Sequence, residues 1–258
     1  MAWPKAAVLI RILASAAAFD EDVIRVTHDV INSAFGRQKL TSVTFIDAHL
    51  DANLRDVDDF ISDMLAVIGS NHVFQILSLD TVVRTIFRRR LSSNVVIVNV
   101  MRDFKNFSKT LTHHTYDYGG YYVIVFKNAT FAETHEIFQT LWDFYIYNLC
   151  LIREVGDQVL VEAFFPFQPS KCNTTEPVAV AAHRNGEFVF KPREYFPLKF
   201  QNFHQCPLKY STYVSLGPSV IRQDFPNKSF ELVGRDVDIQ QVLAESFNFR
   251  AERQFIEY

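Results

Sequence analysis

Short β-branched runs alternate with amphipathic helical segments along the first 165 residues, and this alternation restricts the fold more than any other feature. Strands are predicted at 42–46, 73–79, 94–100 and 121–127, and helices at 23–35, 51–68, 80–91 and from 130 onward. Chains that alternate strands with helices form a mostly parallel sheet covered by helices. The sequence therefore predicts an α/β fold, Rossmann-like and similar to one half of a periplasmic binding protein.

Helix periodicity and a helix-start signal support two of these predictions. In segment 51–68 the apolar residues keep the i, i+3, i+4 spacing of one helical face; they are Val57, Phe60, Ile61, Met64, Leu65 and Ile68. Thr130 and Glu133 have the spacing of a capping box, which begins a helix. Segments 149–152 and 158–164 are predicted to form a closing hairpin or paired strands.

Composition argues against several classes of protein. The formal net charge of -3 lacks the basic excess that phosphate binding requires, so no nucleic-acid partner is expected. The short run Arg88-Arg89-Arg90 is interpreted as a solvated turn or helix end. Beyond the N-terminus there is no apolar run of about 18 residues, so no bilayer span is expected within this sequence.

Sequence motifs for catalysis or metal binding are lacking. The sequence contains no Gly-rich phosphate loop, Gly-x-Ser-x-Gly elbow or His-Glu-x-x-His helix. His113 and His114 are adjacent, so their side chains would point apart and are not expected to share a metal. Asp47 ends a predicted strand, where α/β folds often place functional groups, but we interpret it as the start of a solvated loop. We therefore predict no enzyme activity, cofactor or metal.

Three features favour the secretory pathway. Residues 1–18 combine a lysine, an apolar stretch and small residues, as a signal peptide does, although Arg11 interrupts the stretch. The acceptor pattern Asn-x-Ser/Thr occurs at Asn106, Asn128, Asn173 and Asn227. The cysteines are Cys150, Cys172 and Cys206, and an odd count allows one disulfide with one thiol left over.

Composition changes after the predicted sheet. Six of the nine prolines lie within 166–207, at Pro166, Pro169, Pro177, Pro192, Pro197 and Pro207. This segment is predicted to be an extended connector. A strand at 208–214 and an amphipathic helix at 236–247 follow, and Ile239, Val242 and Leu243 share one face of that helix.

The second half of the chain carries residues that resemble a known receptor family. Glu162-Ala163-Phe164-Phe165-Pro166-Phe167 runs into Cys172, and Asn202-Phe203-His204-Gln205-Cys206-Pro207-Leu208 follows. This arrangement resembles the junction of the amino-terminal and ligand-binding domains in divergent ionotropic receptors of insects, chemosensory relatives of ionotropic glutamate receptors. Leu208 to Tyr213 resembles the first strand of the clamshell ligand-binding domain. Gly234 to Ile239 and Phe247-Asn248-Phe249 resemble the helical element that follows it.

The resemblance implies the extracellular amino-terminal region of a chemosensory ligand-gated cation channel at the plasma membrane. The expected parts are a signal peptide (1–18), an α/β domain (19–165), a Pro-rich connector (166–207) and the incomplete start of a ligand-binding domain (208–258). It also implies a Cys172–Cys206 disulfide, with Cys150 as a buried thiol. A small-molecule ligand and co-receptor subunits of the same family are the expected partners. Membrane spans, pore and second lobe would lie beyond Tyr258, and no ligand-binding residue is carried over.

Two alternatives remain open from the sequence. The chain could be a soluble secreted α/β protein that binds a small ligand, or a cytosolic or secreted α/β enzyme. Glycosylation and continuation of the coding sequence into apolar spans of about 20 residues would favour the receptor. The apolar side chains of the 236–247 helix, with Phe247 and Phe249, are expected to be exposed if the second lobe is needed to cover them.

Overall fold

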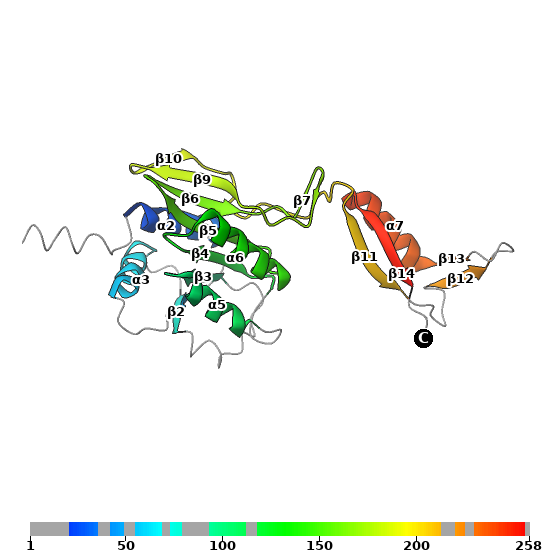
Figure 1. Ribbon diagram of the computed structural model, residues 1–258, viewed down its shortest axis with the longest axis horizontal. Helices are drawn as coiled ribbons and strands as arrows, with labels where there is room; N and C mark the ends of the chain where they lie inside the picture. The colour runs from blue at the N-terminus through cyan, green and yellow to red at the C-terminus, as the bar shows by residue number, and fades with distance from the viewer. Residues whose placement is uncertain are drawn as a thin grey trace, which may run out of the picture. The chain divides into compact units, whose positions relative to one another are not determined.

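The computed structural model describes residues 21–35, 42–48, 55–68, 73–78, 93–111, 118–212, 220–224 and 230–255. The chain divides into two compact units, coloured from N- to C-terminus in Figure 1. The first unit comprises Met1–Phe164 and Thr175–Pro197, and the second comprises Phe165–Thr174 and Leu198–Tyr258.

The described part of the first unit is built on a sheet of eight strands. In spatial order they are β10 (Glu187–Phe190), β9 (Val178–Arg184), β6 (Gln158–Ala163), β5 (Leu149–Val155), β4 (Tyr121–Val125), β3 (Ser93–Ile97), β1 (Ser42–Asp47) and β2 (Val73–Ser78). The strands from β2 to β5 are parallel, whereas β6, β9 and β10 add antiparallel pairs at one edge. The predicted α/β fold with a mostly parallel sheet is confirmed.

Helices cover both faces of this sheet, which makes three layers (Figure 1). Helices α2 (Glu21–Phe35) and α3 (Arg55–Ile68) pack on one face through side chains such as Val26 and Phe60. Helices α5 (Met101–Thr110) and α6 (Phe131–Asp143) pack on the other through Phe107 and Phe138. Burial on both faces explains why the central strands are apolar without alternation.

The pairing of β5 with β6 follows the predicted hairpin. The strands are joined by a two-residue turn in which Gly156 has a positive φ of 63°, a conformation that glycine adopts without steric cost. The loop that follows β10 returns to α2. There the Tyr195 hydroxyl donates to Asp29 Oδ2 at 2.5 Å, and burial together with this bond raises the pKa of Tyr195.

The structure differs from the predicted connector at 166–207. Strands β9 and β10 lie within this range and complete the large sheet. The prolines border these strands instead of interrupting them: Pro177 directly precedes β9, and Pro192 follows β10. Proline lacks the amide that a sheet needs but is accepted at strand ends, so a high proline count did not exclude paired strands.

Helix α5 was not predicted. Its signal is present in Met101, Phe104, Phe107 and Leu111, which keep helical spacing, but Val100 at the cap position is not a favoured N-cap residue. The predicted helix at 80–91 and the Arg88-Arg89-Arg90 run lie outside the described residues.

The second unit contains short sheets and a helix. Its described elements are β7 (Phe167–Gln168), β8 (Lys171–Cys172), β11 (Pro207–Thr212), β12 (Ile221–Asp224), β13 (Phe230–Val233), α7 (Arg235–Phe247) and β14 (Arg250–Phe255). Strand β11 runs parallel to β14, with α7 between them in the chain, and β12 pairs antiparallel with β13. The predicted strand at 208–214 and helix at 236–247 agree with β11 and α7.

A phenylalanine cluster and a disulfide organise the second unit. The cluster consists of Phe167, Phe200, Phe203, Phe247 and Phe249, and the Phe203 ring centroid lies 4.4 to 6.2 Å from the other four. Cys172 is bonded to Cys206 with a Cα–Cα distance of 5.5 Å. The segments that carried the family resemblance are thus brought together, and the expected disulfide is present.

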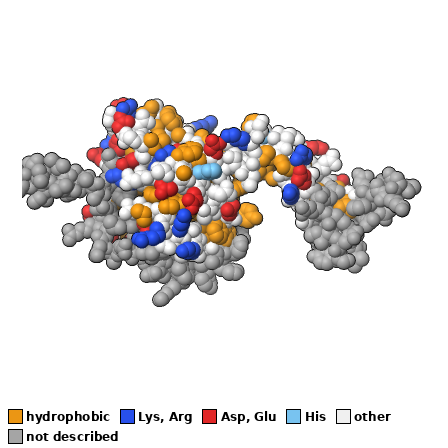
Figure 2. Space-filling model, in the orientation of Figure 1, with side chains coloured by type: hydrophobic (Ala, Val, Ile, Leu, Met, Phe, Trp, Pro, Cys, Tyr) orange, Lys and Arg blue, Asp and Glu red, His pale blue; other side chains and the backbone are white. Residues whose placement is uncertain are grey.

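On the face drawn in Figure 2, acidic, basic and apolar side chains are interspersed over the first unit. In the second unit, α7 has no buried residue, and Ile239, Val242, Leu243 and Phe247 are exposed, as the sequence predicted. Phe249 is half-buried because it joins the phenylalanine cluster. Within the described ranges, no helix has both the length and the apolar character needed to cross a bilayer.

Candidate functional site

The sheet reverses its strand order between β1 and β3. From β1 the chain adds β2 on one side and then β3, β4 and β5 on the other, with the connecting helices on opposite faces. Open α/β sheets bind ligands outside the carboxyl ends of their strands at such a switch point. The carboxyl edge formed by the ends of β1, β3, β4 and β5 is therefore the candidate site.

Asp47 lies at this switch point. It is the last residue of β1 and is opposite Ile97, the last residue of β3. The next residue remains tied to the sheet, because the Ala48 amide donates to the Ile97 carbonyl at 3.2 Å. The Asp47 side chain is half-buried and has a partner within the chain, so it is more enclosed than the solvated loop start that the sequence suggested.

The connection from β3 to α5 is tight. Val98 still pairs with β4, since its amide donates to the Val125 carbonyl at 2.9 Å. Two residues later, the Val100 amide donates to Asp103 Oδ2 at 3.2 Å, and Asp103 is buried. The carboxylate thus satisfies a backbone donor that would otherwise be unpaired at the helix start.

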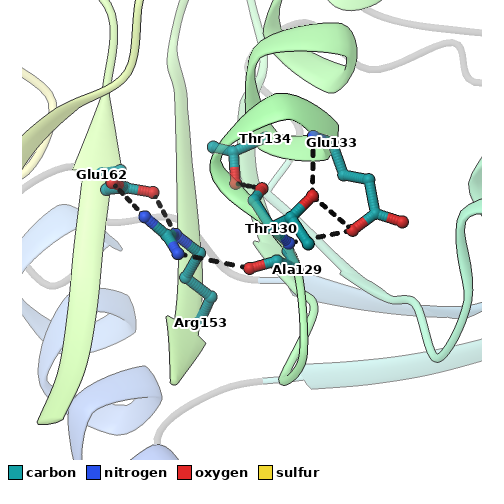
Figure 3. Close-up of polar contacts among 6 residues, drawn as sticks. All are labelled: Ala129, Thr130, Glu133, Thr134, Arg153 and Glu162. Atoms are coloured by element: carbon teal, nitrogen blue, oxygen red, sulfur yellow. Dashed lines mark hydrogen bonds and ion pairs between the residues drawn. The ribbon is translucent and has the colours of Figure 1, made fainter. Parts of the chain in front are cut away.

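The connection from β4 to α6 contains the predicted capping box (Figure 3). The Glu133 amide donates to the Thr130 hydroxyl at 3.2 Å, and the Thr130 amide donates to Glu133 Oε2 at 2.9 Å. Thr134 adds a hydroxyl bond to the Thr130 carbonyl at 3.0 Å. Two donors are satisfied reciprocally, which fixes where α6 begins.

A buried ion pair contacts this turn at the Ala129 carbonyl (Figure 3). Arg153 Nε and Nη2 donate to the two carboxylate oxygens of Glu162 at 2.6 and 2.9 Å. Arg153 Nη1 donates to the Ala129 carbonyl at 3.3 Å, just ahead of the capping box. Both side chains are almost fully buried on the α5–α6 face of the sheet. The pair therefore anchors the β4–α6 turn to β5 and β6.

The predicted glycosylation sites lie in different settings. Asn128 is exposed in the turn before α6, and Asn173 is exposed after β8 with a positive φ of 56°. Asn106 is half-buried within α5, and Asn227 lies outside the described residues, as do the predicted signal peptide and the His113–His114 pair. The described sites are thus not brought together.

Cys150 is buried in β5 and takes no part in the disulfide. Among the residues that the structure describes, no three or more His, Cys, Asp or Glu side chains are grouped so as to hold a metal ion.

Two polar pairs were not predicted from the sequence, Arg153 with Glu162 and His183 with Asp22. Arg153 and Glu162 lie in different strands and face each other only because β5 and β6 form a hairpin, although the predicted hairpin could have suggested their pairing. His183 in β9 is buried, and its Nδ1 lies 3.3 Å from Asp22 Oδ2 in α2. These partners are more than 150 residues apart, so no local pattern connects them.

Comparison with known proteins adds a family. The sequence profile of the family described as "Putative ionotropic receptor, ligand binding domain" matches residues 15–202. This range includes every strand of the eight-stranded sheet and the described helices that cover it, α2, α3, α5 and α6. No curated protein sequence matches the chain.

Proposed function

Because the chain belongs to the ionotropic receptor ligand-binding domain family, we propose that it is the extracellular region of a chemosensory ligand-gated cation channel and binds a small molecule there. The family is one of receptor ligand-binding domains and not of enzymes. The observation that carries the proposal is the match across 15–202, which contains the whole eight-stranded sheet of the first unit. Co-receptor subunits of the same family would be its partners in the channel.

The proposed ligand site is the carboxyl edge of the parallel strands. Support comes from the switch point between β1 and β3, which is where folds of this type bind ligands. Asp47 is the acidic residue of β1 and lies at the end of this strand, next to that point. It is held half-buried at the strand end and is thereby oriented before a ligand arrives.

Ligand binding is tested with the secreted chain and a panel of volatile and water-soluble small molecules. A ligand present at about 100 times its Kd should stabilise the protein by about 2.7 kcal/mol, which differential scanning fluorimetry detects as a higher Tm. We expect Asp47→Asn to weaken binding of this ligand, because loss of the carboxylate charge disturbs the contact of Asp47 with its partner within the chain and with it the end of β1. Asp59→Asn is the matched control, because Asp59 is an exposed aspartate on α3. An equal affinity in both variants would place binding away from this edge, and a panel without any stabilising molecule would contradict the proposed function.

If the protein is extracellular, it should be processed and glycosylated in the secretory pathway. We expect the leader to be removed near Ala18 and glycans to be attached at some of Asn106, Asn128, Asn173 and Asn227 in secretory cells. Treatment with an N-glycosidase should then lower the mass, and asparagine-to-glutamine variants should identify the modified sites. A protein that keeps its leader and whose mass does not change would argue against entry into the secretory pathway.

A further inference from the structure

Apolar side chains are exposed at the ends of three neighbouring strands on the carboxyl edge. Val100 follows β3 and is 45% exposed, Phe131 begins α6 after β4 and is 52% exposed, and Val155 ends β5 and is 41% exposed. Adjacent strands are about 4.8 Å apart, so the ends of β3 and β5 are separated by only about 10 Å. The Glu154 amide also donates to the Lys127 carbonyl at 2.8 Å, which holds the end of β5 beside the turn that leads to Phe131.

Where the structure describes charged side chains at this edge, they already have partners within the chain. Lys127 Nζ lies 3.5 Å from Glu154 Oε1, and Arg153 and Glu162 form the buried pair. Asp103 and Glu133 accept backbone amides at the starts of α5 and α6. Asp47 and Arg102 have partners as well.

An ionic ligand would have to displace one of these partners. A carboxylate or ammonium group placed against exposed apolar side chains loses water without gaining a counter-charge, and such a loss is costly. A neutral ligand meets no such cost, and its apolar surface would cover Val100, Phe131 and Val155. Small-molecule sites are commonly lined by apolar side chains with few polar groups.

From these observations we infer that the carboxyl edge takes a neutral, largely apolar small molecule and not a charged one such as a free amino acid. This inference rests on the proposed function, because it names the ligand class of the proposed site. The exposed apolar side chains supply the contact area, and the internal pairing of the charges supplies the discrimination.

The test uses straight-chain probes that differ only in their head group. Alcohols of four to eight carbons are compared with the corresponding carboxylates and amines, which are charged at neutral pH, and with glutamate. Binding to the secreted protein is measured by calorimetry and by the shift in Tm. We expect the alcohols to bind and to stabilise the protein, with affinity increasing with chain length, and the charged probes to have little effect.

Two matched variants locate the binding. Phe131→Asp places a charge in the apolar contact, and it should still fold because acidic residues are favoured in the first turn of a helix. It should weaken alcohol binding about tenfold or more. Tyr145→Asp is the control, since Tyr145 is an exposed aromatic residue that follows the other end of α6. It should leave the affinity unchanged.

The inference fails if the carboxylates, the amines or glutamate bind as tightly as the alcohols and respond to Phe131→Asp. That result would leave the proposed ligand-binding function in place. It also fails if no alcohol binds, or if Phe131→Asp and Tyr145→Asp have the same effect. The separate panel with Asp47→Asn and Asp59→Asn tests the proposed function itself, so the two failures are distinguishable.

Discussion

Replacement of Arg153 with alanine should lower the free energy of unfolding of the first unit by about 3–5 kcal/mol. The substitution leaves the Glu162 carboxylate buried without the two guanidinium bonds at 2.6 and 2.9 Å. It also removes the donor to the Ala129 carbonyl, which holds the turn before α6. Chemical denaturation followed by circular dichroism and tryptophan fluorescence gives the change, because Trp142 packs in α6 against Phe164.

Arg184 provides the matched control. It pairs with Asp157 at the surface, where both side chains are about half exposed, so Arg184→Ala should cost at most about 1 kcal/mol. The double variant Arg153→Met with Glu162→Leu removes both charges together and should regain much of the lost stability. If Arg153→Ala and Arg184→Ala had equal effects, the buried pair would have no special role in anchoring the turn.

Removal of the Cys172–Cys206 disulfide should destabilise the second unit by about 3–4 kcal/mol, on the chain-entropy view of a bond that closes a loop with a sequence separation of 34. Cys172→Ser with Cys206→Ser leaves the β7–β8 hairpin attached to its unit through the phenylalanine cluster and backbone contacts. Limited proteolysis should then cut the region after residue 198 much earlier than in the native protein.

Cys150→Ala is the control for this experiment. Cys150 is buried in β5 of the first unit, so its replacement should affect the melting of that unit and leave the protease sensitivity of the second unchanged. An equal rate of cleavage with and without the disulfide would show that the phenylalanine cluster alone is sufficient to hold the second unit together.

Local patterns were sufficient for much of the fold. The central strands are buried on both faces, so their apolar runs were clear, and the Thr130–Glu133 spacing located the start of α6 because a capping box depends on four consecutive residues. Strand β9 was not predicted, since its place in the sheet depends on pairing with β6 across the inserted β7–β8 hairpin. A proline count reports where amides are absent but not which strands meet.

The candidate site was less predictable than the fold. Asp47 could be placed at a strand end from sequence alone, but the switch point requires the strand order, which is a property of the whole sheet. The buried Arg153–Glu162 pair depends on the register of β5 with β6. Charge neutralisation at the carboxyl edge likewise combines side chains from several strands and helices, so neither spacing nor composition reveals it.

The second unit consists of two separate segments, and this has a consequence for biosynthesis. A ribosome makes Cys150 and Cys172 well before Cys206, so the native disulfide has to wait until the second segment is synthesised. In that interval Cys172 can form a mixed disulfide with a disulfide oxidant of the compartment, and any accessible thiolate of the chain can then attack its sulfur and release the oxidant's thiol. Cys150 is buried near the start of β5, a strand that lies between β4 and β6, so the competing thiol is withdrawn once the sheet has formed. Early assembly of the first unit thus protects the pairing that the second unit requires.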